Sequence, residues 1–470
     1  MAPMSKGGSG LIFEVDDKPP FIPSLFAAIQ HVLASFVGII TPTLIIGGSL
    51  GLGEHIPYLI SMALMVSGVG TFIQARRIGP VGAGLICVQG TSFAFLGTVL
   101  TVGHMVKGNG GGPEEILATI NGVCFFAAII EVVLSQFIDK LKRIVTPLVT
   151  GIVITTIGLS LIRVGITDIG GGVPLLKGDP EAYANLQNLA VGGFVLVLVI
   201  LLNRMNNPWI RISSIILGMA AGTALAFGLG ITNFGGREVD MFTVPLPFQF
   251  GINFDLAAFI SIGVIYVLTA IETTGDITAN CMISRLPLKG PEYLGRVRRG
   301  VLADGVNSMI ASTFGSFPMT TFSQNNGVIQ LTGVASRHIG MFIGVVLLVL
   351  GLFPVVGAIL MGIPKPVLGG ATLIMFGTVA AAGVKILATE NLNRRNMIIM
   401  ATSFGLGIGV ALRPEIFQHL PGFIKSTFSN PVTMAGVTAI VLTLLLPEES
   451  PEEELEEALD VAARPGEENL

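Results

Sequence analysis

The stretch Gln324-Asn325-Asn326-Gly327, followed by Thr332-Gly333, places a cluster of side-chain amides in a segment otherwise apolar enough to lie in a membrane. Hydrocarbon offers no hydrogen-bond partner, and an unsatisfied polar group there costs several kcal/mol. These amides must therefore face a protein-lined cavity, another helix or a bound molecule. The carboxyl groups of Glu272 and Asp304 upstream raise the same question.

The composition around this stretch is that of a polytopic membrane protein. The chain of 470 residues is 51% hydrophobic and 12% charged, whereas soluble domains carry about 25% charged residues. The first apolar run has no basic start and no small-residue cleavage site, so we expect no removable signal peptide. At about 20 residues per span, we predict an all-α protein with fourteen spans at 24–48, 57–75, 80–101, 115–137, 145–163, 189–203, 212–230, 256–278, 301–316, 319–334, 339–360, 367–384, 397–412 and 430–446.

The basic residues favour a cell-membrane protein with both termini in the cytoplasm. If the amino terminus is inside, the six cytoplasmic connections hold sixteen Lys and Arg residues, and the seven outer connections hold seven. Lys and Arg concentrate on the cytoplasmic side of membrane proteins. The segment 1–23 is then cytoplasmic, and so is the acidic tail 448–470. This tail holds ten of the thirty acids, and we expect a solvated appendage, with a regulatory contact as the less favoured alternative.

The two halves of the chain resemble each other. The spacing Pro-x3-Gly-x6-Gly occurs in the fifth span and recurs seven spans later, in the twelfth, at Pro147, Gly151 and Gly158 and then at Pro366, Gly370 and Gly377. An odd offset inverts the second copy relative to the membrane. Inverted repeats of seven spans each are a transporter architecture that places the substrate near the midplane, on broken helices.

The third and tenth spans are equivalent under this offset, and both are poor helix formers. Glycine, β-branched and small polar residues crowd Gln89-Gly90-Thr91-Ser92-Phe93 in one and Thr320-Thr321-Phe322-Ser323-Gln324-Asn325-Asn326-Gly327 in the other. We therefore expect extended backbone in both spans, paired together or lining a cavity. The two half-helix amino termini would then point at a common centre and offer N–H groups to a bound oxygen.

The eighth span carries the residues best suited to recognise a polar ligand. Glu272 lies inside it, and Asp276 follows one turn later on the same face. A carboxylate accepts two N–H bonds at once, which suits a heterocycle with adjacent ring N–H groups. The amide of Gln324 both donates and accepts, so it matches a ring N–H and C=O pair, and Phe93 can stack on a flat ring.

Each of these residues also has a structural interpretation. Glu272 as a merely hydrogen-bonded acid is the less favoured reading, because buried acids are rare in spans. Asp276 is equally well explained as a structural or capping acid. For Asp304, two roles are equally open: an interfacial acid at the start of the ninth span, or the partner that fixes Glu272 and the tenth span.

The remaining candidates are weighed in the same way. We favour His31 as a satisfied core histidine over a proton carrier, and Asn325 as a brace of the broken tenth span over a substrate contact. For Phe93, stacking on a substrate is favoured over a plain core position.

No catalytic, cofactor or nucleic-acid signature competes with these residues. The chain has no Walker loop, no metal-ligand spacing of His or Cys and no recognisable Ser/His/Asp set, and Cys87, Cys124 and Cys281 read as small apolar residues. We therefore expect a carrier, not an enzyme, with no cofactor and no metal. Titratable Glu272, Asp276, Asp304 and His31 near the centre favour protons as the coupling ion.

At this point the chain resembles the nucleobase/ascorbate transporters, also called the xanthine/uracil permeases. The family signature [Gln/Glu/Pro]-Asn-x-Gly-x4-Thr-[Arg/Lys/Gly] is matched at every fixed position, by Gln324, Asn325, Gly327, Thr332 and Gly333. Further resemblance comes from the runs Glu272-Thr273-Thr274-Gly275-Asp276-Ile277-Thr278-Ala279, Gly300-Val301-Leu302-Ala303-Asp304-Gly305, Gln30-His31 and Gln89-Gly90-Thr91-Ser92-Phe93. It covers about residues 11–447 and looks closest to bacterial xanthine permeases.

The resemblance implies an architecture and a site. Its core would comprise 24–137 and 256–360, its gate would comprise 138–235 and 364–447, and two copies would dimerise through the gates in the bilayer. Side chains of Glu272 and Gln324 would read the base, Phe93 would stack on it, and the backbone at Phe93 and Ser323 would add contacts. Supporting or proton-coupling positions would be Asp304, Asp276, His31 and Asn325.

The resemblance also narrows the substrate. Gln324 in the first signature position is similar to purine carriers, whereas uracil carriers tend to have Glu there. Ser92 stands where some xanthine permeases have Asn, and its smaller side chain leaves space for an extra ring oxygen, so urate is a candidate beside xanthine. We predict a proton-coupled symporter that imports oxidised purines by an elevator-like movement of core against gate. The alternative is a uracil or broader nucleobase symporter. A channel is disfavoured because polarity is concentrated at the broken spans.

Overall fold

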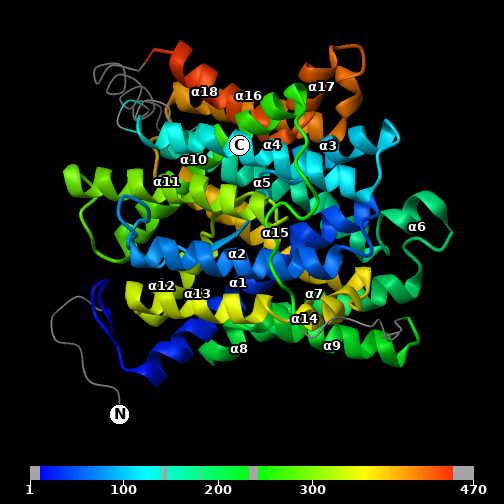
Figure 1. Cartoon of the computed structure of the whole chain (residues 1–470), viewed down its shortest axis with the longest axis horizontal. Helices are drawn as coiled ribbons and strands as arrows, with labels where there is room; N and C mark the ends of the chain where they lie inside the picture. Colours follow the sequence, from blue (N-terminus) through cyan, green and yellow to red (C-terminus); the bar gives the residue numbers. More distant parts are fainter. Residues whose placement is uncertain (1–10, 139, 141–145, 180, 232–241, 448–470) are drawn as a thin grey trace, which may run out of the picture.

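The computed structural model describes residues 11–138, 140, 146–179, 181–231 and 242–447. The predicted acidic tail 448–470 and the first ten residues of the predicted cytoplasmic segment 1–23 lie outside the described residues. Within these ranges the chain is almost entirely helical, with its helices stacked in layers across the molecule (Figure 1).

One group of helices surrounds the amides and carboxyl groups singled out above. Helix α2 packs on α13, α4 packs on both α10 and α11, and α1 contacts α2, α12 and α13. The members of this group are α1 (Phe21–Leu50), α2 (Ile56–Arg76), α3 (Leu96–Gly108), α4 (Pro113–Ser135), α10 (Leu256–Ile283), α11 (Pro291–Thr313), α12 (Gln324–Thr332), α13 (Arg337–Gly351) and α14 (Pro354–Met361).

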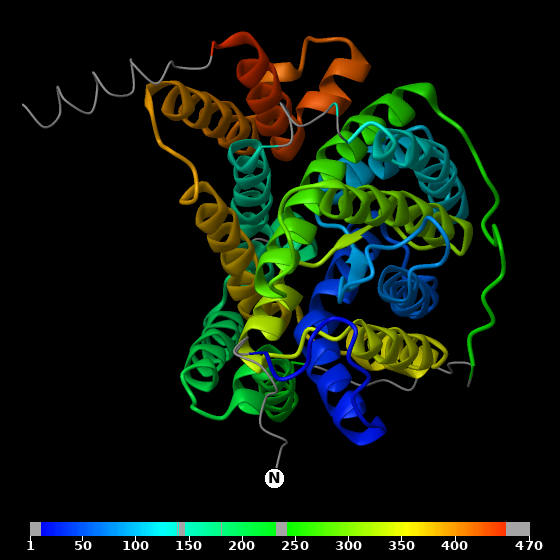
Figure 2. The ribbon, with the colours of Figure 1, turned by 90° about the vertical axis from the view of Figure 1, so that its left-hand side faces the viewer.

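A second group lies beside the first, and Figure 2 shows the two side by side. Helix α15 packs on α5 and α7, and α18 packs on α5 and α16. Its members are α5 (Pro147–Ile169), α6 (Val173–Gly178), α7 (Leu186–Asn203), α8 (Pro208–Ile212), α9 (Ser214–Gly228), α15 (Lys365–Leu387), α16 (Arg394–Leu412), the 3-10 helix η2 (Pro414–Phe417), α17 (Gly422–Phe428) and α18 (Pro431–Leu445). The division of the chain into a core and a gate that move as separate bodies stays a prediction.

Eight of the described helices are long and apolar enough to cross a membrane, namely α1, α2, α4, α5, α7, α10, α15 and α16. They coincide with eight of the predicted spans, so the chain is a multi-pass membrane protein. The predicted eleventh span, 339–360, is broken in the structure, because α13 and α14 meet at a bend of 73°. Pro354 lacks the N–H that a continuous helix needs, and Phe353 before it is extended. The total of fourteen spans stays a prediction.

The predicted extended segments in the third and tenth spans are confirmed. Strands β1 (Gln89–Thr91) and β2 (Met319–Thr321) pair antiparallel, with Gln89 opposite Thr321 and Thr91 opposite Met319. A Cβ atom on Gly90 would lie 2.3 Å from Cζ of Phe322, so only glycine leaves room for that ring. Segments 230 residues apart in sequence are thereby joined by backbone hydrogen bonds.

Two differences from the sequence prediction concern the candidate site. The run Gln324-Asn325-Asn326-Gly327 is not extended, because α12 begins at Gln324 and the extended part ends at Thr321. Helix α11 begins at Pro291, ten residues before the predicted start at 301, after Gly290 at φ 92°. Proline suits a first helical position, where its missing N–H would be unpaired in any case. Arg296, Arg298 and Arg299, which precede the predicted start, therefore lie within this helix.

The repeated proline and glycine spacing marks two helices that pack together. In α5, Gly151 lies against Leu387, and a Cβ atom on Gly158 would be 2.3 Å from the backbone nitrogen of Ala380 in α15. Residue numbers rise along α5 as they fall along α15 at these contacts, so the two helices run antiparallel. This direction is the one that an inverted repeat requires.

Candidate functional site

Asp304 is the centre of a buried hydrogen-bond network. Its Oδ1 atom accepts bonds from Nε2 of Gln74 at 2.8 Å and Nε2 of Gln89 at 2.7 Å. Its Oδ2 atom accepts from the hydroxyl of Thr273, and the hydroxyl of Thr321 lies 3.3 Å from Oδ1. One carboxyl group in α11 thus joins α2, β1, α10 and β2.

This network decides between the two roles left open for Asp304. The interpretation of Asp304 as an interfacial acid at a helix start is wrong. Because α11 starts at Pro291, Asp304 lies in the middle of the helix, and its side chain is fully buried. Its bonds to Thr273, next to Glu272, and to Thr321, in the tenth span, match the alternative of an internal partner.

Two glutamines, Gln74 and Gln89, complete the network. No role was predicted from the sequence for either side chain. Gln74 also donates to the carbonyl of Gly300 and accepts from the backbone N–H of Ala83, so it holds the chain between α2 and β1. Gln89 accepts from Nδ2 of Asn307 at 3.3 Å. The available signal was a polar side chain within an apolar span, the same signal that singled out Glu272.

His31 and Asn325 connect α1 to the start of α12. Nδ2 of Asn325 lies 3.1 Å from Nδ1 of His31 and donates to its backbone carbonyl at 3.2 Å. Because an amide NH2 group only donates, Nδ1 accepts and the ring proton sits on Nε2. That Nε2 atom has no hydrogen-bond partner among the described residues. This geometry fits Asn325 as a brace.

The two acids of α10 differ from Asp304 in that each keeps an unpartnered oxygen. Within the described residues, Oε2 of Glu272 and Oδ2 of Asp276 are buried without a hydrogen-bond partner. The backbone carbonyl of Asp276 accepts from Nδ2 of Asn326, whose own Oδ1 accepts from Asn280. These bonds hold α10 against α12, two residues beyond Gln324.

The predicted ring-stacking residue lies where the two helix groups meet. Phe93 follows β1, is 9% exposed, and meets Phe376 of α15 edge-to-face with ring centroids 5.4 Å apart. Ser92 donates its backbone N–H to the carbonyl of Pro318 at 2.9 Å, and its hydroxyl has no partner among the described residues. The edge-to-face ring pair and the unpartnered hydroxyl thus come from two consecutive residues, Phe93 and Ser92.

Ser323 and Gln324 occupy the start of α12. Ser323 is the N-cap residue and makes no side-chain capping bond. The Gln324 side chain lies against α1, where a Cβ atom on Gly38 would be 3.0 Å from its Nε2. The antiparallel ladder leads into α3 at one end and α12 at the other. At these helix starts, the backbone N–H groups of Leu96, Asn325 and Asn326 donate to the carbonyls of Phe93, Phe322 and Ser323.

Comparison with known proteins identifies the family. Residues 23–416 match the profile of the Permease family, the xanthine/uracil permeases. The chain belongs to this family. It is 45% identical over 449 residues to the xanthine permease XanQ of Escherichia coli strain K12, covering 95% of this chain and 96% of the relative. It is 35% identical over 421 residues to the uric acid permease PucJ of Bacillus subtilis strain 168, covering 89% and 91%.

Two solved structures share the fold of this permease at low identity. The transmembrane domain of the cyanobacterial bicarbonate transporter BicA matches with a TM-score of 0.53 and 15% identity, covering 90% of this chain and 96% of that one. SLC26A9 matches with a TM-score of 0.60 and 13% identity, covering 90% and 64%. The permease therefore shares its fold with these two proteins.

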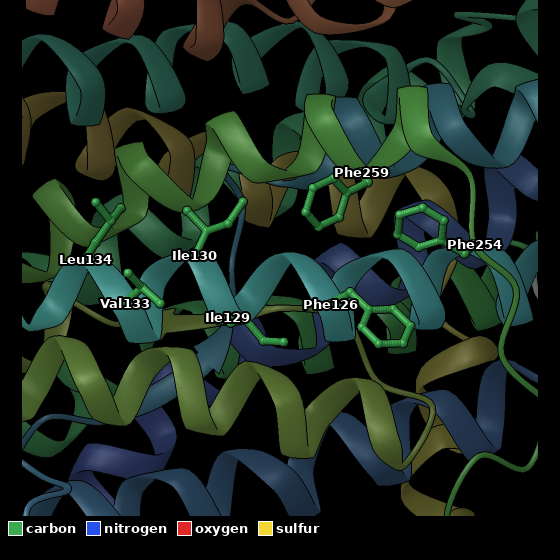
Figure 3. A pocket seen from close by; sticks show the side chains of 7 residues that line it. All are labelled: Phe126, Ile129, Ile130, Val133, Leu134, Phe254 and Phe259. Carbon is green, nitrogen blue, oxygen red and sulfur yellow. The ribbon is translucent and has the colours of Figure 1, made fainter.

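The outer surface of the permease is different in character from this polar centre. A groove of about 660 Å³ between α4 and α10 is lined by seven apolar side chains, shown in Figure 3: Phe126, Ile129, Ile130, Val133, Leu134, Phe254 and Phe259. Several of these side chains are exposed, as expected for a surface that faces lipid. None of the predicted site residues lines this groove.

Within the described residues, the permease has no cluster of three or more His, Cys, Asp or Glu that could hold a metal ion. The three cysteines are free and buried. The polar chemistry at the centre therefore consists of carboxyl groups, amides, hydroxyls and one imidazole.

Proposed function

We propose that this permease is a proton-coupled symporter that imports oxidised purine bases, xanthine or urate, across the cell membrane. The observation that carries the proposal is the unpartnered oxygen of Glu272, one residue from the Asp304 network and on the helix that holds α12. A buried carboxyl oxygen with no partner in a membrane protein is costly unless a ligand or a proton satisfies it. The alternative is a symporter for uracil or a broader set of nucleobases.

The proposed roles follow from the chemistry of each group. Glu272 accepts ring N–H bonds, Gln324 pairs with an adjacent N–H and C=O, and Phe93 stacks on the ring. The backbone at Phe93 and Ser323, beside the starts of α3 and α12, adds further contacts, because helix amino termini favour oxygen acceptors. The free hydroxyl of Ser92 is available to a polar atom on the purine rim.

Relatives support the choice of substrate class. XanQ and XanP of Escherichia coli, at 45% and 44% identity, are named xanthine permeases, and PucJ is named a uric acid permease. These names favour oxidised purines over uracil. Ser92, with its small side chain, leaves both xanthine and urate as substrates of this chain.

The absence of ion pairs at three buried acids, within the described residues, supports protons as the coupling ion. No ion pair to Glu272, Asp276 or Asp304 occurs among the described residues, whose ion pairs join other side chains. An acid within a membrane that has no basic partner gains most from binding a proton. His31, with its Nε2 atom unpartnered, is the remaining titratable candidate.

Movement of core against gate would expose the site alternately to each side of the membrane. The Phe93–Phe376 contact joins a core segment to the gate helix α15, so this movement must slide or separate the two rings. We further propose that the gates of two copies form a homodimer and that both termini are cytoplasmic, as the distribution of Lys and Arg favours.

Uptake by purified protein in lipid vesicles tests the proposal. An inward pH gradient should drive saturable accumulation of labelled xanthine above equilibrium, and removing the gradient with a protonophore should leave only equilibration. Unlabelled urate should compete strongly and uracil weakly. Accumulation that ignores the gradient would contradict proton coupling, and stronger competition by uracil would favour the alternative substrate. Non-saturable flux without exchange would indicate a channel.

A further inference from the structure

The fourth predicted span contains an acid that none of the roles above uses. Glu131 lies in α4 and is fully buried. Both of its carboxyl oxygens lack a hydrogen-bond partner among the described residues, and no described Lys or Arg forms an ion pair with it. Glu272 and Asp276 each leave one oxygen unpartnered. Glu131 leaves two.

Glu131 points to the interior because α4 has two distinct faces. Cys124, Ala127, Ala128, Glu131 and Ser135 are buried and recur with helical spacing. Ile129 and Val133, on either side of Glu131 in sequence, are 42% and 49% exposed and line the apolar groove in Figure 3. The exposed apolar face of α4 therefore separates Glu131 from the outer surface, so water cannot reach its carboxyl group directly from that side.

The groups around Glu131 come from the helices that carry the proposed site. Helix α11 approaches closely: a Cβ atom on Gly305, next to Asp304, would lie 2.9 Å from the backbone nitrogen of Val132. Helix α10 contributes the hydroxyl of Thr269, beside the carboxyl group but outside hydrogen-bonding geometry. The charged groups in electrostatic reach are the acids Asp304 and Glu272.

The other titratable groups on the neighbouring helices do not neutralise Glu131. Tyr266 of α10 donates its hydroxyl to the carbonyl of Cys124. At the cytoplasmic side predicted for α11, Arg298 donates to Gln136, and Arg296 pairs with Glu292. The remaining groups on these helices that titrate or carry charge are Asp276, Cys281, Tyr293, Arg299, His104 and Lys107, with Glu114 and Glu115 at the start of α4 itself. The near environment of Glu131 is acidic and apolar.

An ionised carboxylate cannot remain in such a place. Moving a carboxylate from water into an apolar interior carries a penalty of several kcal/mol even after relaxation, and neighbouring acids increase it. Binding a proton removes the charge and turns one oxygen into an O–H donor. The neighbouring Thr269 hydroxyl cannot stabilise the charged form instead, because it directs its own proton back to the carbonyls of Ile265 and Tyr266.

We propose that Glu131 is a second proton-binding site of this permease, occupied in this conformation and coupled through α10 and α11 to Glu272 and Asp304. In the binding step, a proton from water forms an O–H bond on the Glu131 carboxylate, and the reverse step returns it to water. Any gain or loss of charge at Glu272 or Asp304 changes the affinity of Glu131 for this proton. The role in coupling rests on the proposed proton symport, whereas the protonation itself does not.

The protonation is tested directly by difference infrared spectroscopy of purified protein at neutral pH. The wild type should show a C=O stretching band of a buried, protonated carboxylic acid that shifts in D2O and is lost in Glu131→Gln. Glutamine matches the protonated acid in shape and in having one donor and one acceptor side, so this variant should fold. Glu114→Gln, an exposed change on the same helix, should keep the band. A spectrum unaltered by Glu131→Gln would overturn the assignment.

The coupling is tested by transport. Glu131→Gln should exchange labelled for unlabelled xanthine at wild-type rate but accumulate about tenfold less per unit of pH gradient, since a tenfold ratio corresponds to about 1.4 kcal/mol, the energy of one proton. A pH-sensitive dye should report one proton fewer per purine. Wild-type accumulation in this variant would overturn the coupled role. If wild-type protein ignores the gradient while the infrared band is present, the symport proposal fails and the protonated Glu131 remains.

Discussion

The Asp304 network and the Glu272–Asp276 face of α10 lie next to each other, yet they differ in how far their carboxyl oxygens are hydrogen-bonded. Asp304 receives bonds from four elements, and both its oxygens are used. Glu272 and Asp276 each retain a buried oxygen without a partner in the described structure. A buried polar network whose groups are all hydrogen-bonded stabilises the fold and holds its elements in one arrangement. A buried polar group without a partner can instead bind a ligand or a proton. Within a few residues of α10, Thr273 therefore belongs to the structural framework around Asp304, whereas Glu272 and Asp276 are available for binding.

Breaking the framework should have the largest effect. In Asp304→Ala, the buried donors of Gln74, Gln89 and Thr273 lose their acceptor, and each unsatisfied group costs about 1–3 kcal/mol. We expect a large drop in the thermal unfolding temperature in detergent together with loss of uptake. Asp304→Asn, which keeps one acceptor oxygen, should fall between this variant and wild type. Equal stability of Asp304→Ala and wild type would contradict the framework role.

Changing the unsatisfied acid should affect transport and leave the fold intact. Glu272→Gln removes a charge that no described partner stabilises, so the protein should reach the membrane at the wild-type level and unfold at a similar temperature. Loss of a hydrogen bond to a charged group corresponds to about 1.5–3 kcal/mol, and we expect loss of nearly all xanthine uptake. Binding of labelled xanthine to detergent-solubilised protein separates loss of recognition from loss of movement. Wild-type uptake by this variant would refute the assigned role.

The strand pair connects the two regions, and its packing can be perturbed without altering any polar side chain. In Gly90→Ala the new methyl group would overlap the ring of Phe322, since its Cβ would lie 2.3 Å from Cζ. Overpacking of this kind costs about 1–3 kcal/mol. We expect lower thermal stability and reduced uptake, with recovery in the double variant Gly90→Ala with Phe322→Leu. Failure of the smaller side chain to restore either quantity would show that the ring is not the obstacle.

The smallest effect is expected at the rim of the site. Ser92→Asn replaces an unpartnered hydroxyl with a larger amide side chain and leaves the Asp304 network unchanged. We expect a several-fold weaker competition by urate against labelled xanthine, with xanthine uptake and thermal stability close to wild type. Thr313→Ser, on a half-exposed hydroxyl at the end of α11 that bonds only to its own helix, is the matched control. Unchanged urate competition would remove the steric argument for dual specificity.

The local signals in the sequence located some of these features and missed others for a common reason. Glycine and β-branched residues indicated extended backbone at β1 and β2, and the structure confirms both strands. The same reasoning extended the strand into Gln324–Gly327, which is helical, because weak helix propensity is overridden once Asn325 and Asn326 are held by His31 and Asp276. Propensity acts on the chain alone and does not include these long-range bonds.

The start of α11 illustrates the limit of hydropathy. Arginines near residue 298 reduce local hydropathy, and the predicted span began only after them. In the structure they occupy helical turns, with Arg296 donating to the carbonyls of Ala83 and Gly84. Hydropathy detects the part of a helix that lies in hydrocarbon and does not detect the part that projects beyond it. Hydropathy therefore predicted Asp304 near a helix end, whereas the structure places it in the middle of α11.

By itself, the sequence determined that this protein is a multi-pass membrane permease with broken spans around an amide-rich signature, because hydrocarbon excludes polar groups and helix breakers wherever a span can do without them. The tertiary structure alone decided which polar groups are satisfied. Gln74, Gln89 and Thr321 reach Asp304 across more than one element, and Glu131 is left beside Thr269 with no partner of its own. Whether a buried acid stabilises the fold or is free to bind a proton depends on these contacts, which join segments up to 230 residues apart.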